Sequence, residues 1–128
     1  MTVTRLDEDF RAIDVELKLH FWNRNWHGTQ FGGSLFSMTD PFPALMLIQN
    51  LGPEYAVWDK SAAIRYRRPG QGRVRAEFRF EAGQLEATRA ELADGGKSEP
   101  KFHIEIRDEK KQLIAEVDKV LHVSRRKP

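Results

Sequence analysis

A long apolar segment in the first half of the chain limits the folds that are available to it. Residues 31 to 50 read FGGSLFSMTDPFPALMLIQN, which is too long for one strand and is followed by the helix-breaking residues Gly52 and Pro53. The segment predicts a largely buried helix, about 30 Å long at about 1.5 Å per residue. The rest of the chain must then provide an apolar surface that covers this helix.

Apolar and polar residues alternate in several shorter segments, as expected for strands with one buried face. These segments are residues 14 to 22, 62 to 66, 74 to 80, 102 to 106 and 113 to 123. Pro69 and Gly70 between the second and third segments, and the polar sequence DEKK between the last two, predict two hairpins. Residues 85 to 92 keep helical spacing and precede a glycine pair, which predicts a short second helix.

The order of the segments is strand, long helix, two strands, short helix and two strands. Antiparallel strands need an apolar cover on one face only, and a single hydrophobic helix can provide it. We therefore expect one α+β domain over residues 1–128, with an antiparallel sheet covered by the long helix. The strand over residues 14 to 22 is predicted to lie at the sheet edge, where it either pairs with a second copy of the chain or is protected by its own charges.

Composition excludes several classes of protein. The 128 residues include no cysteine, which excludes disulfides and thiolate chemistry. The 21 basic and 19 acidic side chains nearly balance, so nucleic acid is not an expected partner despite a pI of about 9.0. The sequence shows no secretory signal and no bilayer-spanning segment, which predicts a cytoplasmic protein with no membrane partner. No metal is expected, because His20, His103 and His122 fall in three separate strands.

Gly32 and Gly33 lie near the start of the predicted long helix, where glycine is unfavourable unless another requirement favours it. The first amides of a helix have no intrahelical partner, and bare backbone would let a carbonyl oxygen or a phosphate approach them. The glycines therefore predict either an oxyanion site or a close crossing of the helix over the sheet.

Asp40 is a carboxylate inside the same apolar segment. Asp-Pro is a helix-start sequence, and Pro43 also disturbs a helix, so a kink or break is predicted at Asp40 with this residue as the N-cap. The alternative is a functional role, since a carboxylate in apolar surroundings is suited to act as a general base or a nucleophile.

The segment FGGSLFSMTDPF resembles the signature of hotdog-fold thioesterases of the phenylacetate-pathway type. In that family a His-Gly-Gly sequence is followed by an acidic residue nine positions after the histidine, and here Asp40 lies nine positions after Phe31. The sequence VWDKSAAIRYRRPGQGRVRAEFRF, residues 57 to 80, is also similar to the family pattern. The chain looks most like a thioesterase-like subgroup of the DUF4442 type, but it departs from the signature because Phe31 replaces the histidine.

The resemblance implies a hotdog fold, in which an antiparallel sheet wraps around a long central helix. It further implies a homodimer or a dimer of dimers that hydrolyses an acyl thioester such as an acyl-CoA. Coenzyme A would be part of the substrate, with no cofactor. By position, the amide of Gly32, with Gly33 beside it, would polarise the thioester carbonyl, and Asp40 would activate water or attack directly. Because Phe31 replaces the histidine, a non-catalytic acyl-ligand-binding protein is the alternative.

Further candidate residues flank this signature. Asn25 is a candidate for orienting the water or the carbonyl, and a turn role is the equal alternative. The substrate-binding candidates are His27, Phe31, Lys60, Arg65, Arg67 and Arg68. The arginines would meet the phosphates of coenzyme A, and Lys60 would hold the substrate or a second subunit. For these charged residues the alternative is an ordinary solvated ion pair.

Overall fold

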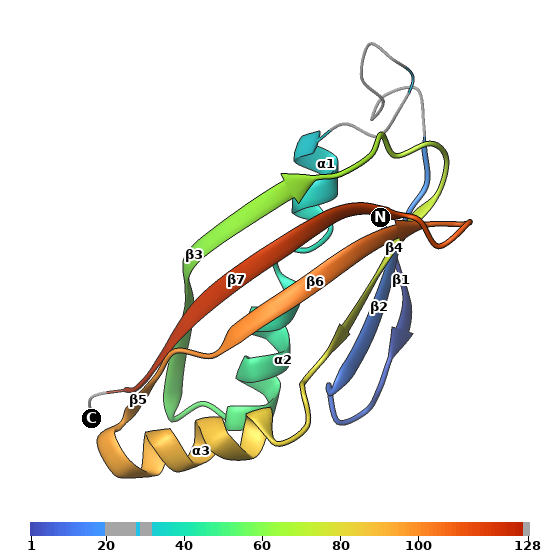
Figure 1. Cartoon of the computed structure of the whole chain (residues 1–128). Coiled ribbons are helices and arrows are strands. Elements are labelled where there is room, and N and C mark those ends of the chain that lie inside the picture. Colours follow the sequence, from blue (N-terminus) through green and yellow to red (C-terminus); the bar gives the residue numbers. More distant parts are fainter. Residues whose placement is uncertain (20–27, 29–31, 127–128) are drawn as a thin grey trace.

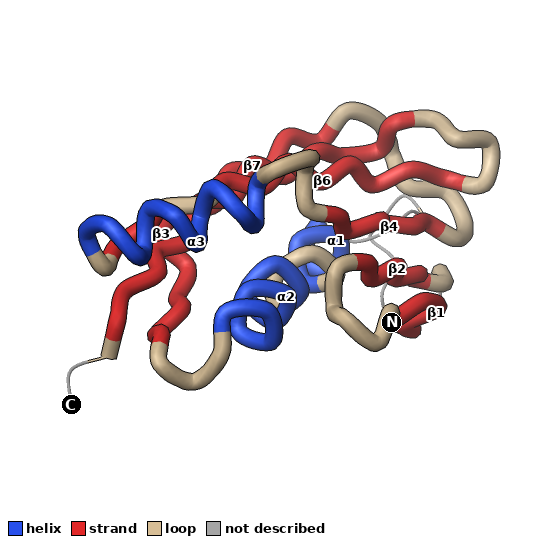
Figure 2. Tube along the Cα trace, turned by 90° about the horizontal axis from the view of Figure 1, so that it is seen from below, coloured by secondary structure: helices blue, strands red, loops and turns tan. Residues whose placement is uncertain are grey.

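The computed structural model describes residues 1–19, 28 and 32–126, which form an α+β unit (Figure 1). Its described strands are β1 (Thr2–Leu6), β2 (Ala12–Leu17), β3 (Tyr55–Tyr66), β4 (Val74–Arg79), β5 (Lys97–Ser98), β6 (Lys101–Asp108) and β7 (Leu113–Arg125). Its described helices are α1 (Gly32–Ser37), α2 (Phe42–Leu51) and α3 (Gln84–Gly95). The strands form one antiparallel sheet, and α2 lies on its concave side (Figure 2).

The order of strands in the sheet is β1-β2-β4-β6-β7-β3, with β5 pairing to β7. The predicted hairpin between β6 and β7 is confirmed. The predicted hairpin between β3 and β4 is wrong, because β3 pairs along β7 and β4 lies between β2 and β6. The connection remains attached to the start of β7, where the amides of Arg67 and Arg68 both donate to the carbonyl oxygen of Ile114. It then crosses the end of the sheet instead of turning back.

The prediction that the strand within residues 14 to 22 lies at the sheet edge is also wrong for its described part, β2, and residues 20 to 22 lie outside the described residues. β2 pairs with β1 on one side and with β4 on the other. The edges of the described sheet are β1 and β3. All five residues of β1 are exposed, so its sequence shows no buried row that would reveal a strand.

The predicted break in the long helix is confirmed between α1 and α2. The amide of Asp40 makes only a long contact of 3.4 Å with the carbonyl oxygen of Ser37, and Pro41 and Pro43 have no amide proton to donate. The predicted capping role of Asp40 is wrong. The N-cap position of α2 is Pro41, and no side chain caps this helix.

The apolar core lies between the two central helices and the inner face of the sheet. The two helices contribute Leu35, Phe42, Met46 and Leu47, and the break between them contributes Met38, all buried. The predicted burial of this long segment is thus confirmed in part, because most of the described core residues come from the strands and Ile48 is 46% exposed. Helix α3 matches the predicted short helix and ends at a left-handed Gly96, whose amide donates to the carbonyl oxygen of Leu92.

Candidate functional site

Asp40 lies in the break between α1 and α2, with its side chain 49% exposed. Its Oδ1 accepts a hydrogen bond of 2.9 Å from Nζ of Lys119 on β7, and its backbone carbonyl oxygen accepts a second bond from the same ammonium group. Oδ2 has no hydrogen-bond or ion-pair partner within the described part of the chain. The helix break therefore presents a carboxylate that is fixed through one oxygen and accessible through the other.

Lys119 is a buried cation, with its side chain only 1% exposed. It belongs to the inner row of β7, in which Val117 and Leu121 on either side of it are fully buried. An ammonium group in such surroundings requires partners, because an unpaired buried charge is strongly unfavourable. Asp40 is one partner, and Asp59 is the other at 3.1 Å between Nζ and Oδ1.

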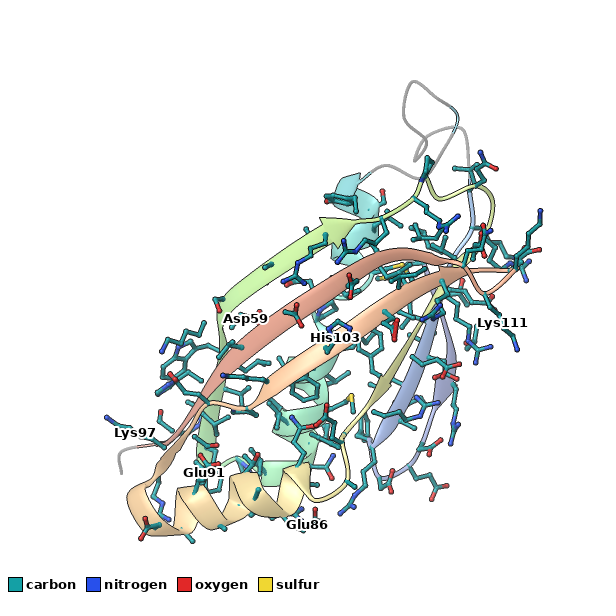
Figure 3. All side chains as sticks on the ribbon, viewed as in Figure 1. Asp59, Glu86, Glu91, Lys97, His103 and Lys111 are labelled. Carbon is teal, nitrogen blue, oxygen red and sulfur yellow. The ribbon has the colours of Figure 1, made fainter. Side chains whose placement is uncertain are left out.

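Asp59 reaches this ammonium group because its partner across the β3–β7 pair is Leu121, two positions from Lys119 in the inner row of β7. The register shifts only after Asp59, between Asp59 and Ser61, which indicates a β-bulge at that point. The Asp59 side chain is 44% exposed (Figure 3). The shared lysine therefore connects the helix break, β7 and the edge strand β3.

Gly32 is the first residue of α1, and Tyr66 at the end of β3 packs directly against it. A Cβ atom at position 32 would lie 3.0 Å from the Tyr66 hydroxyl oxygen, and this hydroxyl donates a 3.2 Å hydrogen bond to the Gly32 carbonyl oxygen. The contact at Gly32 is therefore with the end of one side chain of the sheet, and the predicted close crossing of the helix over the sheet stays a prediction. Gly33 follows within the same turn, and its carbonyl oxygen accepts a 2.8 Å bond from the Ser37 hydroxyl.

Three predicted site residues, Asn25, His27 and Phe31, lie outside the described residues. All three precede α1 in the chain, and Phe31 occupies the histidine position of the family signature. Their roles stay predictions from the sequence.

The basic candidates Lys60, Arg65 and Arg67 lie on β3 or just beyond it, and all three make ion pairs. Arg65 and Arg67 pair with Asp118 and Glu116, which lie on the outer row of β7, away from α2. Lys60 pairs with Glu99 at 2.7 Å. The structure thus brings Asp40 together with Lys119 and Asp59, and it places the arginine pairs on the opposite face of the sheet.

His103 on β6 extends the charged cluster on that outer face. Its Nδ1 lies 2.7 Å from Oδ1 of Asp118, while Arg65 contacts the other carboxylate oxygen at 2.7 Å. The hydrogen bonds from His103 and Arg65 hold the pKa of the Asp118 carboxyl below its usual value. Arg68 is exposed. This arrangement is that of a surface ion-pair network.

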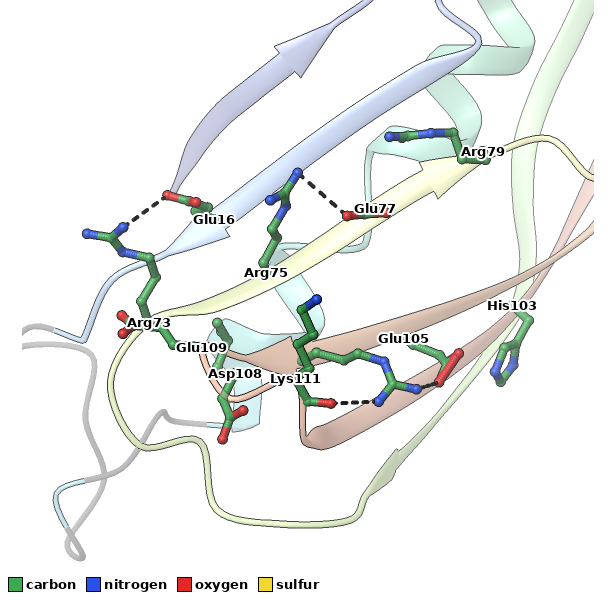
Figure 4. A pocket seen from close by; sticks show the side chains of 12 residues that line it. Glu16, Arg73, Arg75, Glu77, Arg79, His103, Glu105, Asp108, Glu109 and Lys111 are labelled. Carbon is green, nitrogen blue, oxygen red and sulfur yellow. Dashed lines mark hydrogen bonds and ion pairs between the residues drawn. The ribbon is translucent and has the colours of Figure 1, made fainter.

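A wide surface groove of about 660 Å³ also lies on the outer face, and Asp40 does not line it. Charged side chains of β2, β4 and β6 and of the turn after β6 surround it, among them Arg75, Arg79 and Glu105 (Figure 4). The arginines are engaged by carboxylates: Arg75 and Arg79 each contact Asp14 at 2.7 Å. Because the lining charges are of mixed sign and several of them are paired with one another, the groove gives no preference for a ligand of one charge.

No three described His, Asp or Glu side chains are grouped closely enough to hold a metal ion. No helix in the described ranges is long and apolar enough to cross a bilayer.

Lys119 is the site residue that the sequence interpretation missed, although the sequence contains its signal. Inner residues of β7 recur at every second position from Ala115 to Val123, and position 119 in this row is a lysine. A charged side chain in the buried row of a strand requires a charged or polar partner. Alternation alone does not indicate which carboxylate provides it.

Comparison with known proteins agrees with this architecture. The sequence pattern of a family described as a domain of unknown function, DUF4442, matches residues 1–123. A Pseudomonas aeruginosa structure, described as a protein of unknown function and probable thioesterase, has a TM-score of 0.87 at 20% identity, over 97% of this chain and 82% of that one. No curated protein matches the chain.

Two further solved structures are described as thioesterases. One from Haemophilus influenzae has a TM-score of 0.67 at 15% identity, over 96% of this chain and 77% of that one. One from Staphylococcus aureus has a TM-score of 0.70 at 15% identity, over 96% and 92%. At identities this low, the structural similarity establishes a shared fold and no shared activity. The fold is that of thioesterase-like hotdog proteins. The chain therefore belongs to the DUF4442 family and is structurally similar to these proteins.

Proposed function

We propose that the chain is a hydrolase of acyl thioesters, with an acyl-CoA as the reference substrate. The observation that carries the proposal is the Asp40 carboxylate, which lies at the family spacing after the glycine pair and has one oxygen held by Lys119 while the other is accessible. The similarity to solved structures described as thioesterases supports the same reaction class. In this fold we take the sheet to wrap around α2 as its central helix.

In the proposed reaction, Asp40 acts as a general base. Its carboxylate removes a proton from water as the water oxygen attacks the thioester carbonyl carbon. The amide of Gly32 donates to the carbonyl oxygen as it becomes negative, an interaction of about 3 kcal/mol per donor. Collapse of the intermediate breaks the carbon–sulfur bond, and the thiolate leaves with the proton from Asp40. Direct attack by the Asp40 carboxylate, followed by hydrolysis of the resulting anhydride, is the second route to the same products.

We further propose that the working form is a homodimer, or a dimer of two such dimers, with the substrate held between subunits. The edge strand β3 supports this, because it is twelve residues long and pairs with β7 on one side. Exposed Trp58 and Tyr66 lie on this strand. An edge strand of this length is suited to pairing with a second chain. Asn25 remains a proposed residue for orienting the water or the carbonyl. The proposed contacts to the acyl-CoA remain His27, Phe31, Lys60, Arg65, Arg67 and Arg68.

A panel of short, medium, long and aromatic acyl-CoAs tests the reaction. Thiol release can be followed with a thiol-reactive chromogen, since a chain without cysteine adds no background. We expect hydrolysis of at least one member, and Asp40→Asn to lower kcat by about a hundredfold or more. Asp94→Asn, a change at an exposed residue of α3, is the matched control and should keep full activity.

Phe31 in place of the family histidine favours a second function, that of a non-catalytic acyl-ligand-binding protein. Calorimetric titration with the same acyl-CoAs separates the two functions. Binding without thiol release by any member of the panel would support the binding protein and reject the hydrolase. Hydrolysis that is equally fast in Asp40→Asn would reject the role given to Asp40.

A further inference from the structure

The ammonium group of Lys119 makes three polar contacts within the described part of the chain. It donates hydrogen bonds to the carbonyl oxygen and to Oδ1 of Asp40, and it forms an ion pair with Oδ1 of Asp59. Both hydrogen bonds are to Asp40. Lys119 therefore holds this residue at two points, fixing the backbone at the helix break and the direction of the side chain.

This contact also determines which carboxylate oxygen is available for chemistry. Oδ1 of Asp40 is occupied by Lys119, whereas Oδ2 has no partner among the described residues and the side chain is half exposed. A general base must lie within hydrogen-bond reach of the proton that it removes, and a misplacement of about 1 Å can lower a rate about a hundredfold. Holding Oδ1 fixes the position of Oδ2.

Asp59 gives the cluster a second negative charge. When Asp40 takes a proton from water, it loses the charge that balances Lys119. Asp59 Oδ1, 3.1 Å from Nζ, keeps a carboxylate beside the buried ammonium during that step. Without this second carboxylate, proton transfer to Asp40 would leave an unpaired buried cation, which is strongly unfavourable.

We propose that Lys119 is the positioning residue for the Asp40 carboxylate, and that Asp59 is the counter-ion that sustains Lys119 during turnover. The inference rests on the proposed function, because it assigns Asp40 the role of the base. It makes Lys119 act only through Asp40, with no contact of its own to the substrate. This restriction gives the proposal a test that a purely structural lysine would not pass.

The test is a double-mutant cycle on the full-length chain, with the acyl-CoA that is hydrolysed fastest. Lys119→Met retains an unbranched side chain in the apolar row and removes the charge. In the wild-type background we expect kcat to fall at least about tenfold, with KM changed less than about twofold, because a misplaced base impairs the chemical step. In the Asp40→Asn background the same change should leave kcat unaltered. Lys101→Met, an exposed lysine of β6, is the control.

Asp59→Asn is the second variant, and it keeps the proposal testable if Lys119→Met does not fold. It should lower kcat in the wild-type background and have no effect in the Asp40→Asn background. Equal loss of kcat in both backgrounds, for either variant, would overturn the proposal, since the residue would then act through general stability. Wild-type kcat in Lys119→Met would overturn it as well. If Asp40→Asn alone hydrolyses the substrate at the wild-type rate, the catalytic role in the proposed function is rejected. The cycle separates this outcome from a failure of the Lys119 proposal because it includes Asp40→Asn as a single variant.

Discussion

The Tyr66 hydroxyl donates a hydrogen bond to the carbonyl oxygen of Gly32 and fills the space that a side chain at position 32 would occupy. This contact joins the end of edge strand β3 to the first turn of α1. Gly32 does not have the positive φ that would by itself require glycine. The close approach of Tyr66 is thus a structural reason that favours glycine at this position.

Gly32→Ala should lower the free energy of unfolding by about 1 kcal/mol, because the new Cβ atom would lie 3.0 to 3.2 Å from three atoms of the Tyr66 side chain. In a Tyr66→Ala background the same substitution should be neutral or stabilising, since alanine is the better helix former. Urea unfolding of the four proteins measures both values. An equal loss in both backgrounds would show that the Tyr66 contact is not the cause.

Met46→Ala should be among the costly single changes in α2. Met46 is 0% exposed, whereas its neighbour Leu45 is only partly buried against the core. We expect Met46→Ala to lower the free energy of unfolding by about 2 to 5 kcal/mol, and Leu45→Ala to cost less. Denaturant midpoints that fall in the opposite order would mean that α2 presents a different face to the sheet.

Asp14 should make part of the stability depend on pH. Burial raises the pKa of its carboxyl, but the hydrogen bonds and charges of Arg79 and Arg75 outweigh burial and lower the pKa below the usual 3.8. Because the pKa of Asp14 is lower in the folded state than in the unfolded state, its ionised carboxyl stabilises the fold, and this contribution is fully present above pH 3.8. The contribution is lost as the pH falls through the folded-state pKa. Asp14→Asn should therefore cost about 1 to 3 kcal/mol at pH 7.

Measuring the free energies of unfolding of the wild type and Asp14→Asn at pH 5 and pH 3, as well as at pH 7, provides the internal control. Because stability from Asp14 is lost only on acidification, the gap between wild type and Asp14→Asn should persist at pH 5 and narrow at about pH 3. Other carboxyls with lowered pKa values, such as Asp118, are common to both proteins and cancel in the difference. A gap that stays constant down to pH 3 would contradict the assignment.

The proposed dimer predicts a mass of about twice 14.8 kDa, or four times that value, by light scattering at micromolar concentration. The expectation now depends on β3, because β2 is paired on both sides. A mass of 14.8 kDa across this concentration range would show that the edge of β3 is unpaired in solution.

The elements were largely predictable from local sequence, and the pairing of strands was not. Alternation located β4, β6 and β7, and the Asp40-Pro41 sequence located the helix break. Alternation does not state which strands are neighbours, so β3 and β4 were wrongly joined as a hairpin. Strand β1 gave no signal because all of its residues are exposed.

The candidate site was predictable in part for the same reason. The glycine pair and Asp40 stand close together in the sequence, so their spacing was visible. Lys119 and Asp59 lie 79 and 19 residues from Asp40 in the chain, and the pairing of β3 with β7 brings Asp59 to the lysine that contacts Asp40. Register depends on tertiary contacts, which a single sequence does not display.

The contact with Lys119 changes what Asp40→Asn should do to stability. From the sequence, a cap role predicts an unchanged unfolding midpoint, because asparagine caps as well as aspartate. In the structure Asp40 is no cap, and its charge balances a buried ammonium group. Asp40→Asn should therefore lower the free energy of unfolding by about 1 to 2 kcal/mol, since the amide oxygen still accepts a hydrogen bond and Asp59 remains.

The combination of Asp40→Asn with Asp59→Asn should cost more than the sum of the two single changes, by about 1 kcal/mol or more. Each single variant leaves Lys119 with one carboxylate partner. The double variant leaves it with none, although its charged side chain is only 1% exposed. Adding Lys119→Met to the double variant removes that cation and should recover stability. Urea unfolding at pH 7 measures these four variants and the wild type. Strictly additive losses, with no recovery on adding Lys119→Met, would mean that the two aspartates do not share this lysine in solution.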